Sequence, residues 1–346
     1  MRSGELRQFG RHKQAGVTLV ELMISLTLGL ILLSALLTVF SNSSAARSEL
    51  ERTSRQIENG RYAIQVMSDD LRVAGFYGEL SVGAMPIPAA LPDPCSTTPA
   101  DWNTAIPLHL QGYDDGASPP TCMPGNAKAG SDIFVVRRVK TCVAGVGDCE
   151  AVTANKSYLQ ASLCNTDASQ YVLGVQGGVT FPLREKDCAA AAGQREYVVH
   201  VYYIANDNGA GQNVPTLTRL ELTTGPALVQ VPLVEGIEEI NVEYGIDTDG
   251  DGQADAYSAD PTNYTYAGCT NCTPGNNWAN VVTAHLYVLA RSVDPSPGHN
   301  DTRTYRLGLN AAGNAIVFGP NFDRFRRNVY TAMVRIANPA GRRDAP

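Results

Sequence analysis

The longest run of apolar positions lies near the N-terminus, from Val17 to Phe40. These 24 residues contain a single charged side chain, that of Glu21. A helix of about 20 mostly apolar residues is long enough to cross the hydrocarbon core of a bilayer, so the run predicts a membrane-spanning helix. A carboxylate at the centre of such a span costs about 2.5–3.5 kcal/mol, and less near an interface. A charge kept at this cost indicates a function for Glu21.

The same helix is predicted to continue beyond the membrane with an amphipathic pattern. No proline occurs between Val17 and Met85, so no residue forces a break. Small and apolar residues recur at alternating intervals of four and three, which places them on one face. They are rich in small side chains, which favours packing on a sheet over a coiled coil. The stripe comprises Ala46, Leu50, Thr53, Ile57, Gly60, Ile64, Met67, Leu71 and Ala74.

Beyond Gly75 the pattern changes to short apolar or alternating runs separated by turn residues, which predicts strands. One long helix followed by many strands indicates an α+β fold with antiparallel sheets and long loops. Residues 81–130, rich in Pro, Gly and Ser, are expected to be mostly loop, and Val234–Glu238 a short helical turn. The expected strands are Ile133–Val139, Tyr197–Ile204, Leu217–Leu222, Leu228–Val231, Ile240–Ile246, Val281–Arg291, Arg303–Leu307 and Val329–Ile336.

These patterns divide the chain into segments. We expect a leader (1–16), a transmembrane half of the helix (17–40), an amphipathic half (41–74), a globular β-rich domain (75–338) and a flexible tail (339–346).

Charge supports one orientation in the membrane. Four basic residues precede the span against one acidic residue, and basic flanks stay in the cytoplasm, so the globular domain is predicted to be periplasmic. The whole chain carries a net charge of −7, and the part beyond the leader is more acidic still. This argues against a nucleic-acid-binding surface. The leader charges are Arg2, Arg7, Arg11 and Lys13, with Glu5 as the acid.

All eight cysteines follow the predicted span, in a compartment where disulfides form. Short loops favour sequence neighbours, above all Cys142 with Cys149, although eight cysteines allow 105 connectivities. A disulfide is favoured over half a zinc site for Cys269 and Cys272, because no second pair of zinc ligands completes the site. The cysteines are Cys95, Cys122, Cys142, Cys149, Cys164, Cys188, Cys269 and Cys272.

An acidic loop follows the strand that ends at Ile246. Its oxygen-bearing residues have the spacing of a calcium loop, at positions one, three, five and nine around a glycine at six, with a backbone carbonyl at seven. These ligands would be Asp247, Asp249, Asp251, Asp255 and the carbonyl of Gln253.

The match to a calcium loop is incomplete. Position twelve holds Ser258 where glutamate is usual, so a further ligand must come from Asp260, water or elsewhere. The flanking segments do not resemble two helices, so an EF-hand pair is not expected. We expect calcium as a structural ion that rigidifies the loop. The alternative is a solvated acidic hairpin turn, because Asp-Gly is common in turns.

Catalytic motifs are absent from the sequence: it has no GxSxG elbow, no HExxH and no phosphate-binding glycine loop. Adjacent Glu238 and Glu239 would point to opposite sides of a strand. His200 and His285 lie in predicted strands and are expected to be structural. The basic residues Arg324, Arg326 and Arg327 are expected at a polar edge or a subunit contact. The chain is therefore predicted not to be an enzyme.

The sequence Gly16-Val17-Thr18-Leu19-Val20-Glu21 resembles the processing site of type IV pilins and type II secretion pseudopilins. In that family a prepilin peptidase cuts after the glycine and methylates the new N-terminus, here Val17, so that glutamate becomes the fifth residue. Phe or Met is commoner at the position of Val17. The resemblance implies that the Val17 amine of one subunit meets Glu21 of another in the fibre. An unpaired charge is costly in low dielectric, so the pair would set the register between subunits.

The C-terminal half resembles PilW-type minor pilins, through the stretch from Glu243 to Asp251 and the stretch from Phe325 to Thr331. The resemblance implies a low-abundance subunit that joins other minor and major pilins and helps to prime pilus assembly. Its partners would be those pilins, the prepilin peptidase and the inner-membrane assembly platform. It would span the inner membrane once, then pass into the pilus on the cell surface, near the tip.

Two other functions remain open at this point. A minor pseudopilin of type II secretion would have the same helix and work in a periplasmic pseudopilus. A signal-anchored calcium-dependent adhesin would never assemble and would keep residues 1–16.

Overall fold

The computed structural model describes residues 16–116, 118–266 and 269–343. Its longest element is the helix α1 (Leu19–Arg72). The chain divides into two compact units, Met1–Glu51 and Arg52–Pro346, and the division falls within α1. The prediction that one helix runs from Val17 to about Ala74 is therefore confirmed to within two residues at each end.

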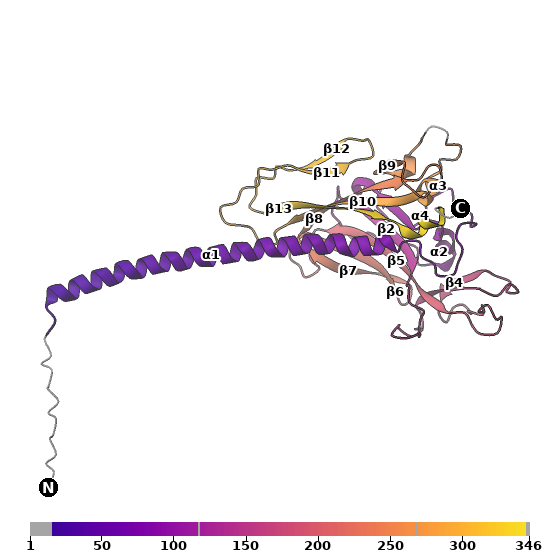
Figure 1. Cartoon of the computed structure of the whole chain (residues 1–346), viewed down its shortest axis with the longest axis horizontal. Coiled ribbons are helices and arrows are strands. Elements are labelled where there is room, and N and C mark those ends of the chain that lie inside the picture. The colour runs from indigo at the N-terminus through magenta and orange to yellow at the C-terminus, as the bar shows by residue number, and fades with distance from the viewer. Residues whose placement is uncertain (1–15, 117, 267–268, 344–346) are drawn as a thin grey trace, which may run out of the picture. The chain divides into compact units, whose positions relative to one another are not determined.

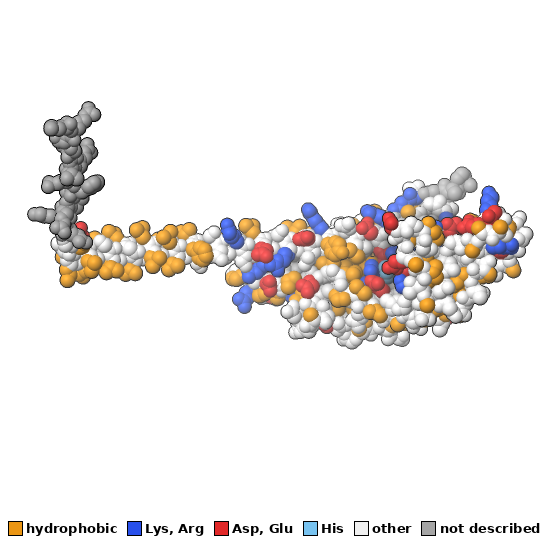
Figure 2. Space-filling view, turned by 90° about the horizontal axis from the view of Figure 1, so that it is seen from below, with side chains coloured by type: hydrophobic (Ala, Val, Ile, Leu, Met, Phe, Trp, Pro, Cys, Tyr) orange, Lys and Arg blue, Asp and Glu red, His pale blue; other side chains and the backbone are white. Residues whose placement is uncertain are grey.

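In the first unit, residues 22–40 of α1 carry no charged side chain. Hydrophobic side chains cover this part of the helix (Figure 2) and are exposed throughout residues 17–40. Among the described residues, α1 is the one helix long and apolar enough to cross a membrane. Its hydroxyl groups are satisfied within the helix: for example, Ser25 Oγ donates to the Glu21 carbonyl at 2.7 Å, and Thr38 Oγ1 to the Ala35 carbonyl at 2.7 Å. Such bonds let polar side chains enter an apolar medium at low cost.

The second unit contains antiparallel sheets, which confirms the predicted α+β class (Figure 1). The largest sheet has the order β1-β2-β5-β3-β4, and the long strand β5 also pairs with β6, which pairs with β7. Its strands are β1 (Leu110–Tyr113), β2 (Ile133–Val139), β3 (Ser157–Ala161), β4 (Tyr171–Val175), β5 (Gln194–Ala205), β6 (Thr216–Thr223) and β7 (Ala227–Glu235).

A second sheet has the order β13-β10-β8-β9, and a separate hairpin joins β11 to β12. These strands are β8 (Ile237–Ile246), β9 (Ala256–Ser258), β10 (Val281–Arg291), β11 (Tyr305–Leu309), β12 (Ala315–Phe318) and β13 (Arg327–Arg335). The remaining elements are α2 (Pro99–Ala105), α3 (Pro274–Ala279), α4 (Ala337–Arg343) and the short 3-10 helices η1 (Asp114–Gly116) and η2 (Pro261–Asn263).

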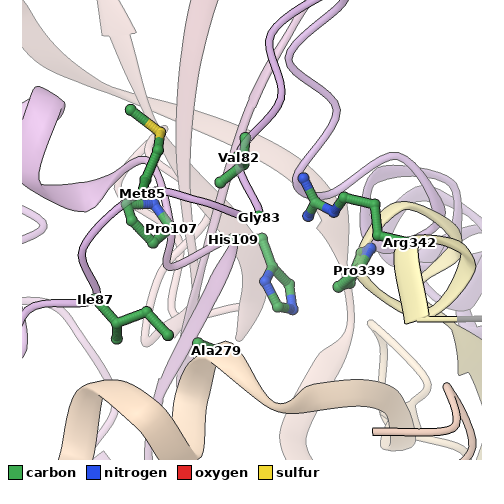
Figure 3. A pocket seen from close by; sticks show the side chains of 9 residues that line it. All are labelled: Val82, Gly83, Met85, Ile87, Pro107, His109, Ala279, Pro339 and Arg342. Atoms are coloured by element: carbon green, nitrogen blue, oxygen red, sulfur yellow. The ribbon is translucent and has the colours of Figure 1, made fainter.

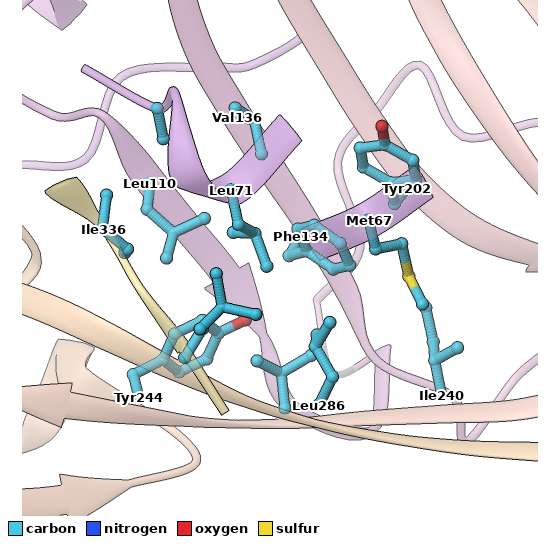
Figure 4. Close-up of a cluster of buried hydrophobic side chains, with 14 of the residues drawn as sticks. Met67, Leu71, Leu110, Phe134, Val136, Tyr202, Ile240, Tyr244, Leu286 and Ile336 are labelled. Atoms are coloured by element: carbon cyan, nitrogen blue, oxygen red, sulfur yellow. The ribbon is translucent and has the colours of Figure 1, made fainter. Parts of the chain in front are cut away.

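The main core lies where both sheets and the end of α1 meet. Phe134 and Val136 of β2 reach it from one sheet, and Leu286 of β10 reaches it from the other (Figure 4). Met67 and Leu71 complete it from α1. Burying each side chain of this size contributes about 1.5–3 kcal/mol.

Residues of opposite parity on β2, such as Val135, face a second core on the other side of the same sheet. A strand that is buried on both faces is rich in apolar residues along its length. This pattern predicted β2 with its observed bounds.

The amphipathic stripe is confirmed from Gly60 onward but not before it. Gly60, Met67, Leu71 and Ala74 are buried, whereas Leu50 is 71% exposed and Ile57 is also exposed. The spacing was right for the helix, but the partner sheet covers only its later turns.

Residues 81–130 are mostly loop, as predicted, and also contain α2, β1 and η1. Two local predictions were wrong. Val234–Glu238 is not helical: it holds the end of β7, the start of β8 and Gly236 between them, at φ 77°. The expected flexible tail is helical as far as Arg343, and residues 344–346 lie outside the described residues.

Four disulfides hold the long loops, including the predicted Cys142–Cys149 and the Cys269–Cys272 pair that was favoured over zinc. The other two join Cys95 to Cys122 and Cys164 to Cys188.

Candidate functional site

The Gly16–Val17 peptide bond lies outside helix α1. Residues 16–18 have no regular structure, and Val17 is 67% exposed. Thr18 acts as the N-cap, because its Oγ1 accepts the Glu21 N–H at 3.2 Å and its carbonyl accepts the Leu22 N–H at 3.1 Å. The predicted leader charges lie outside the described residues.

Glu21 lies in the first turn of α1, with its side chain exposed. Thr18 followed three residues later by Glu21 has the pattern of a capping box, which is a signal for the start of a helix. A carboxylate in a first turn also interacts favourably with the helix dipole. The position therefore suits a negative charge.

Asp70 of α1 joins the helix to the large sheet through a buried network. Its Oδ1 accepts Arg138 Nε at 2.7 Å, while its Oδ2 accepts the Tyr202 hydroxyl at 2.8 Å and lies 2.5 Å from His200 Nδ1. Burial alone would raise the pKa of Asp70, but the hydrogen bond to His200 and the charges of His200 and Arg138 hold it well below its ordinary range. Burial lowers the pKa of His200, so Arg138 is the permanent cation of this network. The structural assignment of His200 agrees with this arrangement.

Gly60 allows α1 to lie directly against β13. A Cβ placed on Gly60 would lie 2.2 Å from Cε2 of Tyr330. At this glycine the ring of Tyr330 packs against the backbone of α1.

The acidic loop 247–255 connects β8 to β9. Asp247 is 1% exposed, and its two oxygens accept the Gly250 and Gly252 N–H groups at 2.6 and 3.0 Å. Carboxylate oxygens of Asp247, Asp249 and Asp255 lie within 4.8 Å of one another. This group of oxygen ligands fits a hard cation such as calcium.

Two predicted ligands behave differently from expectation. Asp251 does not belong to that group; its oxygens accept the backbone N–H of Gln253 at 2.7 Å and its side-chain amide at 3.2 Å. Asp260, the suggested extra ligand, instead caps η2 by accepting the Thr262 N–H at 2.9 Å. The calcium prediction therefore rests on Asp247, Asp249 and Asp255.

Arg327 was expected at a polar edge and is instead buried. Its guanidinium donates to Glu238, Asp301 and Asp323, and the Arg327 Nη1–Asp301 Oδ2 distance is 2.9 Å. These bonds raise the pKa of Arg327, although burial opposes them. Glu238 and Glu239 do point apart, as predicted: Glu239 pairs with Lys128 at 2.9 Å.

A cavity of about 290 Å³ opens between the loop around Met85, the end of α3 and helix α4 (Figure 3). Its lining is mostly apolar, and its titratable side chains are those of His109 and Arg342. His109 Nε2 lies 2.8 Å from the carbonyl of Val281. The lining includes no carboxylate, serine or cysteine that could act with the histidine, so the cavity lacks the partners of a catalytic site.

Comparison with known families matches the chain at two places. Residues 11–37 match the prokaryotic N-terminal methylation motif, and residues 201–338 match Type IV Pilus-assembly protein W, PilW. Together, the two matches support a type IV pilin of PilW type. A comparison with curated proteins and with solved structures finds no match.

These matches indicate a structural subunit related to the type IV pilus. The two matched stretches contain both sets of residues on which the sequence resemblance was based. The methylation match includes Gly16 and Glu21, and the PilW match includes β8, β10, β13 and the acidic loop. The match also agrees with a membrane-anchored helix.

Proposed function

We propose that this chain is a minor pilin that helps to prime type IV pilus assembly and lies near the fibre tip. In this proposal a prepilin peptidase cuts after Gly16 in the cytoplasm and methylates Val17. The inner membrane holds α1 until the subunit moves into the fibre, and the disulfide-bonded domain faces the periplasm.

The observation that carries the proposal is the coincidence of the methylation motif with the start of α1. Gly16 and Val17 precede the N-cap, and Glu21 occupies the first turn. In this register a new amine at Val17 would lie about one helical turn from Glu21 along the axis of α1. An axial displacement of that size between neighbouring subunits would bring the amine of one to the carboxylate of the other. The long disulfide-bonded loops of the second unit suit a rare or terminal position better than a repeated shaft.

The proposal is tested by the N-terminal residue of the protein recovered from sheared surface filaments. We expect N-methylated Val17 as the first residue by mass spectrometry. Replacing Gly16 by leucine is expected to block processing and leave residues 1–16 attached, whereas Gly29→Leu, within the apolar part of α1, should be processed normally.

Two other outcomes of this experiment would support the alternative functions. A chain that still begins at Met1 would favour a signal-anchored adhesin. Processed protein that co-purifies only with a secretion apparatus, and never with surface filaments, would favour the type II secretion pseudopilin.

A further inference from the structure

A second group of carboxylates lies where β1 ends and β2 begins. Asp114 and Asp115 directly follow β1, and Asp132 directly precedes β2. Tyr113 pairs with Ile133 across these antiparallel strands, so the acids that come next on each side face one another. Carboxylate oxygens of all three lie within 4.8 Å of one another. Asp115 is exposed, Asp114 is half-buried and Asp132 is only 1% exposed.

Backbone amides from three directions hold these acids, but no basic side chain does. Asp132 accepts the N–H groups of Asp115 and of Val242 on β8, each at 2.8 Å. Asp114 Oδ2 accepts the N–H of Ala311, in the turn between β11 and β12, at 2.9 Å. Within the described residues, none of the three carboxylates has an ion-pair partner within 4.0 Å. The described side chains therefore supply no cation to these three carboxyl groups, and burial raises the pKa of Asp132 and of Asp114.

Two buried polar atoms at this cluster lack hydrogen-bond partners among the described residues. One is Asp114 Oδ1 itself, and the other is the hydroxyl of Tyr244, a residue that is 1% exposed. A buried polar group without a partner costs about 1–3 kcal/mol, so two at one place call for an explanation.

The Tyr244 hydroxyl lies against the end of β1 that leads into the acids. Tyr244 reaches from β8 into the space between the sheets (Figure 4), and a Cβ on Gly112 would lie 2.2 Å from its hydroxyl oxygen. Gly112 is two residues before Asp114, and its strand partner Phe134 is two residues after Asp132, so the hydroxyl lies near the strand ends from which the acids continue. In agreement, Asp132 and Asp114 add to burial in raising the pKa of Tyr244.

We propose that Asp114, Asp115 and Asp132 form a calcium site, separate from the loop 247–255, in whose outer shell the Tyr244 hydroxyl donates a hydrogen bond. Calcium accepts six to eight oxygen ligands in irregular geometry, whereas magnesium demands a near-ideal octahedron, so a set of three acids from one turn and one strand end suits calcium. Water or backbone carbonyls complete the coordination. The ion links the β1–β2 turn to β8 and, through Ala311, to the β11–β12 hairpin.

Calcium titration calorimetry of the full-length chain in detergent, after chelation of bound metal, tests the proposal. The double variant Asp114→Asn/Asp115→Asn is expected to bind one calcium ion fewer per chain than the wild type. Asp69→Asn, which removes one exposed acid of α1, is the control and should bind as the wild type does. Equal stoichiometry and affinity in the wild type and the double variant would overturn the proposal.

Melting temperature in chelator and in calcium separates a ligand role from a purely structural one. In chelator the double variant should be at least as stable as the wild type, because it removes repulsion between carboxylates, and it should lose the part of the calcium-induced rise that this site supplies. A variant that is less stable in chelator and keeps the whole rise would show that these acids serve only the fold.

Two further variants test the role of Tyr244 and distinguish this site from the loop 247–255. Tyr244→Phe, which tests the outer-shell hydrogen bond, should weaken calcium affinity about tenfold. Asp247→Asn/Asp249→Asn should leave this site intact, so loss of all calcium binding in that variant alone would assign the binding to the other loop. Equally tight binding of magnesium alone would overturn the assignment to calcium.

Discussion

At the scale of single residues, Gly60 determines how closely the helix approaches the sheet. The ring of Tyr330 occupies the place where any larger residue would put its Cβ. In an isolated helix, alanine would be favoured over this glycine by about 1 kcal/mol, so the close contact outweighs the intrinsic preference.

Replacing Gly60 by alanine is therefore expected to lower the free energy of unfolding by about 1–3 kcal/mol, the usual cost of overpacking. Adding Tyr330→Ala should make the two effects less than additive, because the clash is then gone. Chemical denaturation measures both. Gly83→Ala is the control: nothing lies within 4 Å of its Cβ position, and its change should stay within about 0.5 kcal/mol. A Gly60→Ala variant more stable than the wild type would contradict the packing argument.

At the scale of elements, the Asp70 network fixes the end of α1 to β2 and β5. Arg138 is mostly buried, and its partner Asp70 is 5% exposed. Removing one partner of a buried pair typically costs 3–5 kcal/mol, because the other charge stays buried and uncompensated. Asp70→Asn is expected to lower the free energy of unfolding at pH 7 by about that amount, and Asp69→Asn, one residue away and exposed, by little.

The pH dependence of this network follows from the direction of both pKa shifts. The pKa of Asp70 is lowered in the folded state, so its contribution is present above the ordinary value of 3.8 and is lost as the pH falls below it. The pKa of His200 is also lowered, so the unfolded chain takes up a proton below about 6.5 before the folded chain does, which again reduces stability. The free-energy difference between the wild type and Asp70→Asn should therefore be greatest near neutral pH and shrink below pH 4. A difference that grows on acidification would refute the assignment.

The acidic loop between β8 and β9 presents three carboxylates at close range, and a bound cation would remove their repulsion. The double variant Asp247→Asn/Asp249→Asn should abolish the rise in melting temperature that calcium causes through this loop. Differential scanning calorimetry in calcium and in chelator measures the rise. Asp251→Asn is the matched control, because Asp251 bonds to Gln253 and should leave most of the rise in place. If both variants behave alike, the loop does not bind calcium in the way we propose.

At the scale of the whole molecule, the proposed assembly depends on Glu21, the one charged residue between Val17 and Phe40. An unpaired carboxylate in an apolar fibre core is far costlier than one that meets an amine. Glu21→Ala is expected to reduce co-purification with partner pilins by more than about tenfold, a change of 1.4 kcal/mol or more. The melting temperature should not change, because Glu21 lies outside the unit that contains the sheets. Ser25→Ala, which removes a hydroxyl bonded only to its own helix, should assemble normally; equal loss in both variants would point to a general defect of the helix.

Much of the fold could be predicted because its signals are local. The bounds of α1, β2 and β10 follow from periodicity and from the absence of proline, and Cys142 pairs with Cys149 because the loop between them is short. The short strands β1, β3, β4, β9 and β12 were missed, since three to five residues carry too little periodic pattern to distinguish them from loop. Arg327 was misplaced because nothing in its neighbourhood in the sequence reveals Glu238 and Asp301, which neutralise it from other parts of the chain.

The sequence alone determined the membrane helix, the processing motif, the succession of strands and the spacing of acids in the loop 247–255, because each depends on residues close together along the chain. Only the tertiary structure decided which helical turns are covered, why Gly60 is a glycine, and that Asp70 meets His200 and Arg138. It also places Asp114 and Asp115 close to Asp132. The Tyr244 hydroxyl, which has no hydrogen-bond partner among the described residues, lies against the adjacent end of β1. These features depend on contacts between residues far apart in the sequence, and burial gives such contacts their energy by removing the water that would otherwise screen the charges.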